Sequence, residues 1–241
     1  CVLIDPIPHR VGLFEATNEF IEAIHNWTRE HNALMVFDEV ITFRTNYGGA
    51  QENYRVSPDL TALGKMIGGG FPVGAFAGRA DIMKVMDPNE NPLLLPHSGT
   101  FSANPITMTA GYHAMLDFDK DAVVKLNSLT AKAISQIQEA IKIADVPMSI
   151  SGSGSMFRLH PRKTTPNSYR KAYQAVKEKA VMTKLLDYLF YKENIIMVNT
   201  GTCMFSTAIT QKEVDKLSQG MLNAFIEIKT ELTQVHAEYH H

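Results

Sequence analysis

The sequence predicts an α/β protein that joins a mostly parallel sheet with flanking helices to a smaller C-terminal α+β domain. The first observation is a succession of strand, helix and strand over residues 2–38, which forms a βαβ unit and therefore implies parallel strands. The second is a change of pattern near Phe118 and Asp119, after which longer amphipathic helices alternate with short strands. We therefore expect one domain over residues 1–118 and a second over residues 119–241.

In the first domain, the hydrophobic period identifies each element. The expected elements are strands over residues 2–5, 34–38 and 73–78 and helices over residues 14–31 and from Pro105 onward. One side of the first helix is expected to carry four large apolar residues, Phe20, Ile21, Ile24 and Trp27. The apolar run that ends at Phe37 fits a buried parallel strand. Pro105 suits the start of its helix because proline is favoured in the first turn. The small residues of 73–78 suit a close approach of the backbone to a ligand.

The second domain is expected to alternate helices with short strands. The expected elements are a long helix marked by Val123, Leu126, Ile134, Ile137 and Ile141, strands over residues 155–160, 195–198 and 203–207, a helix over residues 168–191 and a final helix from Lys212. This order is typical of a compact α+β unit packed around a small sheet.

Composition indicates a globular protein and excludes several classes of partner. The chain has 241 residues, 45% of them hydrophobic, and a net charge of −2, so neither nucleic acid nor an anionic membrane is an expected partner. No apolar stretch approaches the roughly 18 residues that a membrane-spanning helix needs. Cys1 and Cys203 form neither a disulfide framework nor a metal pair, and His240 with His241 is a poor metal site. We expect a cytoplasmic protein without a bound metal.

The most informative residues are Lys65, which precedes a run of glycines, and Asp38, which ends an apolar strand. A lysine amine held at a pocket floor can form a Schiff base with an aldehyde cofactor, and burial there keeps part of it unprotonated. A carboxylate beside a pyridine nitrogen keeps that nitrogen protonated, so the ring can accept electrons. Open α/β sheets bind ligands at the carboxyl ends of their strands, where Asp38 is expected. The pair predicts a site for pyridoxal phosphate (PLP).

The glycine run does not match either common nucleotide-binding fingerprint. Residues 68–74 do not have the spacing of the dinucleotide motif G-x-G-x-x-G. A phosphate-binding P-loop would need a glycine five positions before Gly64 and a serine or threonine in place of Met66. Nucleotide binding is therefore not expected at this position.

These motifs resemble the second half of the class III, fold-type I PLP-dependent aminotransferases, in the subgroup of glutamate-1-semialdehyde 2,1-aminomutase and its β-amino-acid transaminase relatives. The segments that carry the resemblance are LIDPIPHRVGL, LMVFDEVITFR, SPDLTALGKMIGGGFPVGAFAGRADIM, HSGTFSANPITMTAGYHAML and GSGSMFRLH. They cover most of residues 1–160. Because the family's first half has no counterpart here, we expect this chain to be a part of a longer enzyme.

The resemblance implies a role for each of four residues. Lys65 is implied as the Schiff-base lysine and proton shuttle, and Asp38 as the partner of the pyridine nitrogen. Val40 is implied to pack on one face of the cofactor ring. Thr100 is implied to bind the cofactor phosphate of the neighbouring subunit, so a homodimer with shared sites is expected. The implied partners are therefore a second copy of the protein and small amino acids and keto acids.

Three departures from the family pattern bear on the reaction. Asp5 stands where the family has glutamate, and Ile41 replaces a glutamine that many members carry. Residues 195–207 lack the glutamate of the semialdehyde mutase, and their length fits the β-amino-acid transaminases better. We therefore expect transfer of an amino group between an amino acid, including a β-amino acid, and a keto acid or aldehyde. The alternatives are the intramolecular aminomutase reaction and a non-catalytic module for scaffolding or dimerisation; the amino donor and acceptor stay open.

Overall fold

The computed structural model describes residues 1–239, and the chain divides into two compact units. Unit 1 consists of Cys1–Pro6 and Ala16–Asp121, and unit 2 of Ile7–Glu15 and Ala122 to the C-terminal end of the described chain. The terminal pair His240 and His241 lies outside the described residues. The assignment of residues 1–118 and 119–241 to a cofactor-binding and a small domain stays a prediction.

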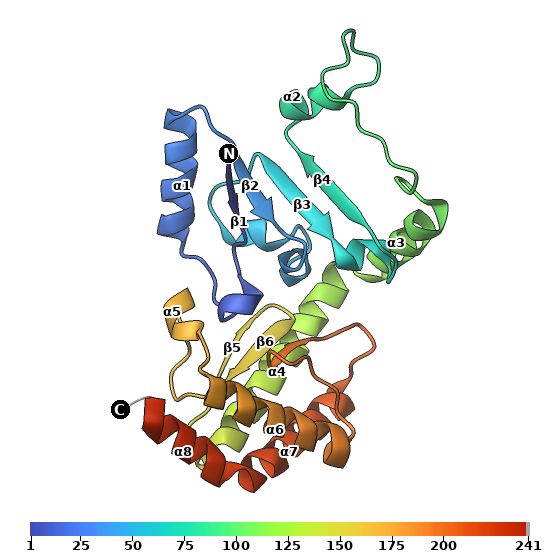
Figure 1. The fold of residues 1–241 in the computed structure, drawn as a ribbon. Helices are drawn as coiled ribbons and strands as arrows, with labels where there is room; N and C mark the ends of the chain where they lie inside the picture. Colours follow the sequence, from blue (N-terminus) through green and yellow to red (C-terminus); the bar gives the residue numbers. More distant parts are fainter. Residues whose placement is uncertain (240–241) are drawn as a thin grey trace. The chain divides into compact units, whose positions relative to one another are not determined.

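Unit 1 is built on a four-stranded sheet in the order β1-β2-β3-β4 (Figure 1). Its elements are β1 (Val2–Ile4), α1 (Asn18–Glu30), β2 (Met35–Asp38), the 3-10 helices η2 (Thr42–Thr45) and η3 (Ala50–Asn53), β3 (Leu60–Gly64), η4 (Lys65–Gly68), β4 (Gly74–Gly78), α2 (Ala80–Met83), η5 (Lys84–Met86) and α3 (Pro105–Asp117). Strands β1, β2 and β3 are parallel, and β4 runs antiparallel to β3. The expectation of an α/β fold with a mostly parallel sheet is confirmed.

The core of unit 1 joins α1 to the sheet. Ile21 of α1 packs with Met35 and Phe37 of β2 in a fully buried cluster. The rings of Tyr54 and Phe37 are nearly perpendicular, at 82°, with ring centroids 5.8 Å apart. Burying such side chains stabilises the unit by about 1.5–3 kcal/mol each relative to leaving them in water.

The prediction of which residues of α1 face the core is only partly right. Ile21 is buried and Ile24 packs partly against the cluster, but Phe20 and Trp27 are about half exposed, at 53% and 49%. The helix begins at Asn18 after its N-cap residue Thr17, and it buries a narrower stripe than the hydrophobic residues suggest. Trp27 instead stacks on His31, one turn later, with ring centroids 4.3 Å apart.

Unit 2 packs long helices beside a three-stranded sheet, β5-β6-β7, as Figure 1 shows. Its elements are the 3-10 helix η1 (His9–Val11), α4 (Lys120–Ala144, whose first two residues belong to unit 1), β5 (Ser149–Ser153), β6 (Met156–His160), α5 (Tyr169–Ala172), α6 (Val176–Glu193), β7 (Thr202–Met204), α7 (Gln211–Glu227) and α8 (Lys229–Tyr239). Every residue of β6 is buried, and both of its edges are paired. The largest fully buried side chains of the unit include Leu126, Phe157, Leu185 and Phe225.

Two expectations for unit 2 are wrong. The apolar run 195–198 is not a strand: Asn194 ends α6 in a left-handed conformation, and the Gly201 amide closes a turn onto the Val198 carbonyl. Ile196 is 81% exposed. The expected helix over residues 168–191 is two helices, because Tyr173 and Ala175 have extended backbones between α5 and α6.

Within residues 1–239, no helix combines the length and apolar character needed to cross a bilayer. The same residues contain no group of three or more histidine, cysteine, aspartate or glutamate side chains placed to hold a metal ion.

Candidate functional site

The two chemically informative residues lie at the carboxyl ends of adjacent parallel strands. Asp38 is the last residue of β2, and Lys65 follows the last residue of β3. The register pairs Asp38 with Ala62, and the Glu39 amide extends the ladder by donating to the Ala62 carbonyl at 2.9 Å. Both residues therefore emerge at the same edge of the sheet, which is where open α/β sheets bind ligands.

Asp38 is half-buried and locally fixed. Its Oδ1 accepts a hydrogen bond from the backbone amide of Val40 at 3.1 Å. This contact between a side chain and the amide two residues later turns the chain out of the strand. The other carboxylate oxygen, Oδ2, takes no part in this contact.

Lys65 has a backbone conformation that L-residues seldom adopt. Its φ is 52°, in the left-handed region, and it begins η4 immediately after the extended Gly64. Such a conformation costs about 1–2 kcal/mol, and conformations of this kind gather at functional sites. The side chain is exposed rather than buried on a pocket floor, which corrects that expectation.

Val40 lies beside the residue that precedes the lysine. A Cβ placed on Gly64 would stand 3.3 Å from Val40 Cγ1 and 3.4 Å from the Val73 carbonyl oxygen. The apolar Val40 side chain therefore packs over the end of β3. The structure brings Asp38, Val40 and Lys65 together at one sheet edge.

Helix α3 supports η4 through close backbone contact. A Cβ on Gly111 of α3 would stand 2.2 Å from the Ile67 carbonyl oxygen, and one on Gly69 would stand 2.4 Å from that of Ala110. Gly69 also has a left-handed φ of 58°. Glycine is thus required on both sides of this contact, which fixes the segment that follows Lys65.

Glu39 is a structural acid that sequence reasoning did not identify. It is fully buried, and its carboxylate accepts hydrogen bonds from the backbone amides of Ala50 and Gln51, at 2.5 and 3.1 Å. Burial raises the pKa of Glu39, and these hydrogen bonds oppose the rise. The residue next to Asp38 thereby ties the end of β2 to η3.

Asp59 joins the strands from the opposite end. Its buried carboxylate accepts from Arg29 Nη2 at 2.6 Å, Arg79 Nη1 at 2.8 Å and the Met35 amide at 2.8 Å. Burial opposes its ionisation, but these donors outweigh burial and lower the pKa of Asp59 to about 2. The network sets β2, β3 and β4 relative to α1.

Thr100 lies apart from the other three predicted residues. It is exposed and lines a cleft of about 670 Å³ in unit 1 together with residues 72–74, 99, 101–104, 107 and 108. Asp38, Val40 and Lys65 do not line this cleft. Gly74 does, and it pairs with Gly64 in the sheet.

The donor set at the sheet edge fits PLP. A primary amine, a carboxylate and an apolar side chain are the groups that the cofactor's aldehyde, pyridine nitrogen and ring face require. The strained lysine backbone is an independent sign that this edge is a functional site.

Comparison with known proteins points to one family. A family model described as Aminotransferase class-III matches residues 1–187. A curated relative, the glutamate-1-semialdehyde 2,1-aminomutase of Archaeoglobus fulgidus, is 34% identical over 221 residues, which is 89% of this chain and 51% of the relative. The chain thus spans about half the length of that relative.

Solved structures show the same fold. An omega-transaminase from Sphaerobacter thermophilus has a TM-score of 0.89 and 36% identity, over 92% of this chain and 51% of its own. A structure described as a transaminase with PLP bound has a TM-score of 0.86 and 30% identity, over 97% of this chain and 53% of its own. The expected fold-type I architecture is confirmed by these similarities.

Proposed function

The chain belongs to the class III aminotransferase family, and from this we propose that it is part of an enzyme that moves an amino group with the help of PLP. The observation that carries the proposal is the placement of Asp38 and Lys65 at the ends of adjacent parallel strands, with Lys65 in a strained conformation. The proposed reaction transfers the amino group of an amino acid, including a β-amino acid, to a keto acid or aldehyde.

In this proposal, each residue at the sheet edge has one task. Lys65 Nζ would hold the aldehyde carbon of the cofactor, and the Asp38 carboxylate would accept a hydrogen bond from the ring nitrogen. When bound, PLP supplies an electron sink for the negative charge that forms on the substrate carbon. Val40 would cover one ring face and exclude water there.

The proton transfer is assigned to Lys65. When not bonded to the cofactor, Lys65 Nζ would take the proton from the amine-bearing carbon of the substrate. The side chain is exposed at the sheet edge and is therefore accessible to a substrate there. The fixed backbone of η4 limits its range of positions.

The aminomutase reaction is a second candidate, because the curated relative at 34% identity carries that name. The transaminase reading has similar support from the structure at 36% identity. A transaminase needs a separate amino acceptor, whereas a mutase converts glutamate-1-semialdehyde alone. Product analysis with and without a keto acid acceptor therefore separates the two reactions.

The cofactor and its lysine are tested by absorbance. The intact protein mixed with PLP is expected to develop the band of a covalently bound cofactor, and Lys65→Ala is expected to lose it. Lys84→Ala is a matched control, since Lys84 is also exposed in unit 1 but lies in η5. Absence of the band from the unaltered protein and from both variants would reject the catalytic proposal in favour of a non-catalytic module.

A further inference from the structure

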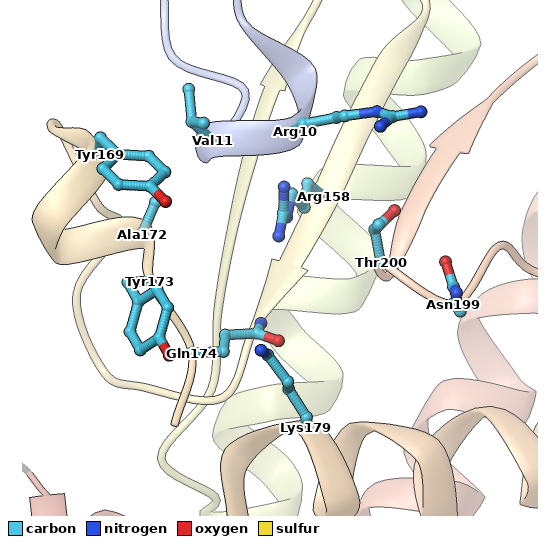
Figure 2. A pocket seen from close by; sticks show the side chains of 10 residues that line it. All are labelled: Arg10, Val11, Arg158, Tyr169, Ala172, Tyr173, Gln174, Lys179, Asn199 and Thr200. Atoms are coloured by element: carbon cyan, nitrogen blue, oxygen red, sulfur yellow. The ribbon is translucent and has the colours of Figure 1, made fainter. Parts of the chain in front are cut away.

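Unit 2 contains a cavity of about 370 Å³ whose lining carries three cationic side chains (Figure 2). They come from three separate elements: Arg10 from η1, Arg158 from β6 and Lys179 from α6. Among the described residues, no aspartate or glutamate lines this cavity. Its lining is therefore strongly positive at neutral pH.

Arg158 is buried and forms no ion pair with a carboxylate of residues 1–239. It is only 5% exposed, and its Nη1 donates to the His9 carbonyl at 2.7 Å. Its Nε is fully buried and has no hydrogen-bond partner among the described residues. A buried guanidinium with one neutral acceptor lacks most of the compensation that a buried charge requires.

The surroundings of Arg158 further destabilise its buried positive charge. Burial lowers the pKa of Arg158, and the nearby positive charge of Arg162 lowers it further. The buried carboxylate of Glu178 compensates the charge of Arg162 rather than that of Arg158. It accepts hydrogen bonds from Arg162 Nη2 at 2.7 Å and from the Ala175 amide at 2.8 Å. Arg162 is thus neutralised within the fold, and Arg158 faces the cavity.

The remaining lining suits an organic ligand. Tyr169 and Tyr173 supply aromatic surface, and Figure 2 shows both rings on the same side of Arg158. Lys179 Nζ lies 5.3 Å from the centre of the Tyr173 ring. Gln174 and Thr200 add neutral hydrogen-bonding groups.

We propose that this cavity binds a small organic acid, whose carboxylate pairs with Arg158 and is attracted by Arg10 and Lys179. The planar fork of an arginine matches a carboxylate with two parallel hydrogen bonds. Inorganic phosphate has no carbon atoms to contact the aromatic and aliphatic side chains of the lining. A ligand with a carbon skeleton is therefore favoured. The site lies within unit 2 and does not depend on the reaction proposed for Lys65.

Calorimetric titration of the chain with succinate at low ionic strength tests the site. Succinate is the probe because it carries two carboxylates on a short carbon chain that a cavity of this volume holds. Succinamide, its neutral counterpart, is expected not to bind, and inorganic phosphate is expected to bind more weakly than succinate. Equal binding of succinate and succinamide, or preferential binding of phosphate, would overturn the carboxylate assignment.

Variants locate the binding to this cavity. Arg158→Gln is expected to weaken succinate binding by about tenfold or more, because it removes a charge-assisted pair. Arg10→Gln and Lys179→Gln alter exposed residues and are expected to weaken it about threefold or more, so the test does not depend on the folding of the buried variant.

The matched controls are Arg170→Gln on α5 and Lys192→Gln on α6, which remove one positive charge outside the cavity. Both are expected to leave succinate binding unchanged. If Arg10→Gln and Lys179→Gln bind succinate as tightly as these controls do, the proposed site is wrong.

Discussion

Lys65 presents its amine from a backbone in an unfavourable, left-handed conformation. The left-handed φ of 52° costs about 1–2 kcal/mol for a residue with a Cβ, whereas a glycine would adopt it freely. A lysine at such a position is more informative than a lysine in a regular strand, because strain of this kind persists only where the surrounding structure enforces it. The contacts of η4 with α3 supply that enforcement.

His160 is a second residue whose environment has a measurable consequence. It is buried in β6, and its Nε2 lies 2.8 Å from Ser151 Oγ, which itself donates to the Gly12 carbonyl at 2.7 Å. The serine proton is therefore engaged, so His160 Nε2 carries the proton that Ser151 accepts. Burial, with the charges of Arg158 and Arg162, lowers the pKa of His160 to about 3.

This depressed pKa predicts a loss of stability in mild acid. The unfolded chain binds a proton at His160 near its ordinary pKa of about 6.5, while the folded chain does not until about 3. The stabilising contribution is complete above about pH 6.5 and is lost as the pH falls toward 3, at up to about 1.4 kcal/mol per pH unit.

Urea unfolding at about pH 7 and about pH 5 measures this difference in the free energy of unfolding. His160→Gln is expected to make this difference between the two pH values smaller. His113→Gln alters an exposed histidine of α3 and is expected to leave the difference unchanged. Equal pH dependence in the two variants would contradict the role given to His160.

At the scale of elements, the contact between η4 and α3 predicts an unusual response to alanine. Glycine to alanine in a helix ordinarily gains up to about 1 kcal/mol. Gly111→Ala is instead expected to destabilise the protein by about 1–3 kcal/mol, because the new Cβ would meet the Ile67 carbonyl at 2.2 Å and a backbone must shift.

The same substitution is expected to weaken PLP retention through displacement of Lys65. Thermal unfolding and cofactor absorbance measure the two effects. Gly74→Ala is the control for thermal unfolding, since a Cβ at that position meets no atom within 4 Å. If Gly111→Ala were as stable as Gly74→Ala, the close contact would not be what holds η4 in place.

The sequence predicted an element correctly where the hydrophobic period indicates a strand or helix and the fold also supplies a partner for it. The parallel pairing of β1 and β2 follows from the apolar runs on each side of α1, and Pro105 begins α3 as expected, after the N-cap residue Asn104. Residues 195–198 have an equally apolar pattern but pair with no strand among the described residues. Strand pairing is a tertiary property that local composition does not specify.

The candidate site was predictable in part for the same reason. Asp38 and Lys65 were identifiable because each stands beside a local signal, a strand end and a glycine run. Glu39, Asp59 and the left-handed backbone of Lys65 were not, since their roles depend on partners remote in sequence or on a dihedral angle. The exposure of Phe20 and Trp27 has no local signal either.

At the scale of the whole molecule, the proposed role of Thr100 requires two copies of the chain. If Thr100 serves the site of the neighbouring subunit, a Lys65→Ala subunit and a Thr100→Val subunit each lack a different part of each site. A mixed dimer then contains one site with both residues intact. We expect each variant alone to be nearly inactive and the mixed dimer to recover about half of the activity per dimer.

Amino transfer measured after co-refolding of the two variants tests this prediction. A mixture of the two separately assembled variants is the control, because it contains no mixed dimers. If co-refolding gave no recovery beyond that control, Thr100 would act within its own subunit or have no part in the reaction.

The register of β2 and β3 also limits how the chain length can vary. Asp38 is opposite Ala62, and Lys65 stands just beyond Gly64, so each functional residue is positioned by its own strand. Extra residues beside the exposed Ser57, in the turn before β3, would lengthen only a surface connection, which costs little. One residue inserted within Leu60–Gly64 would instead turn Lys65 to the other face of the sheet. Insertions and deletions among homologues should therefore accumulate in that turn and be absent from the strand.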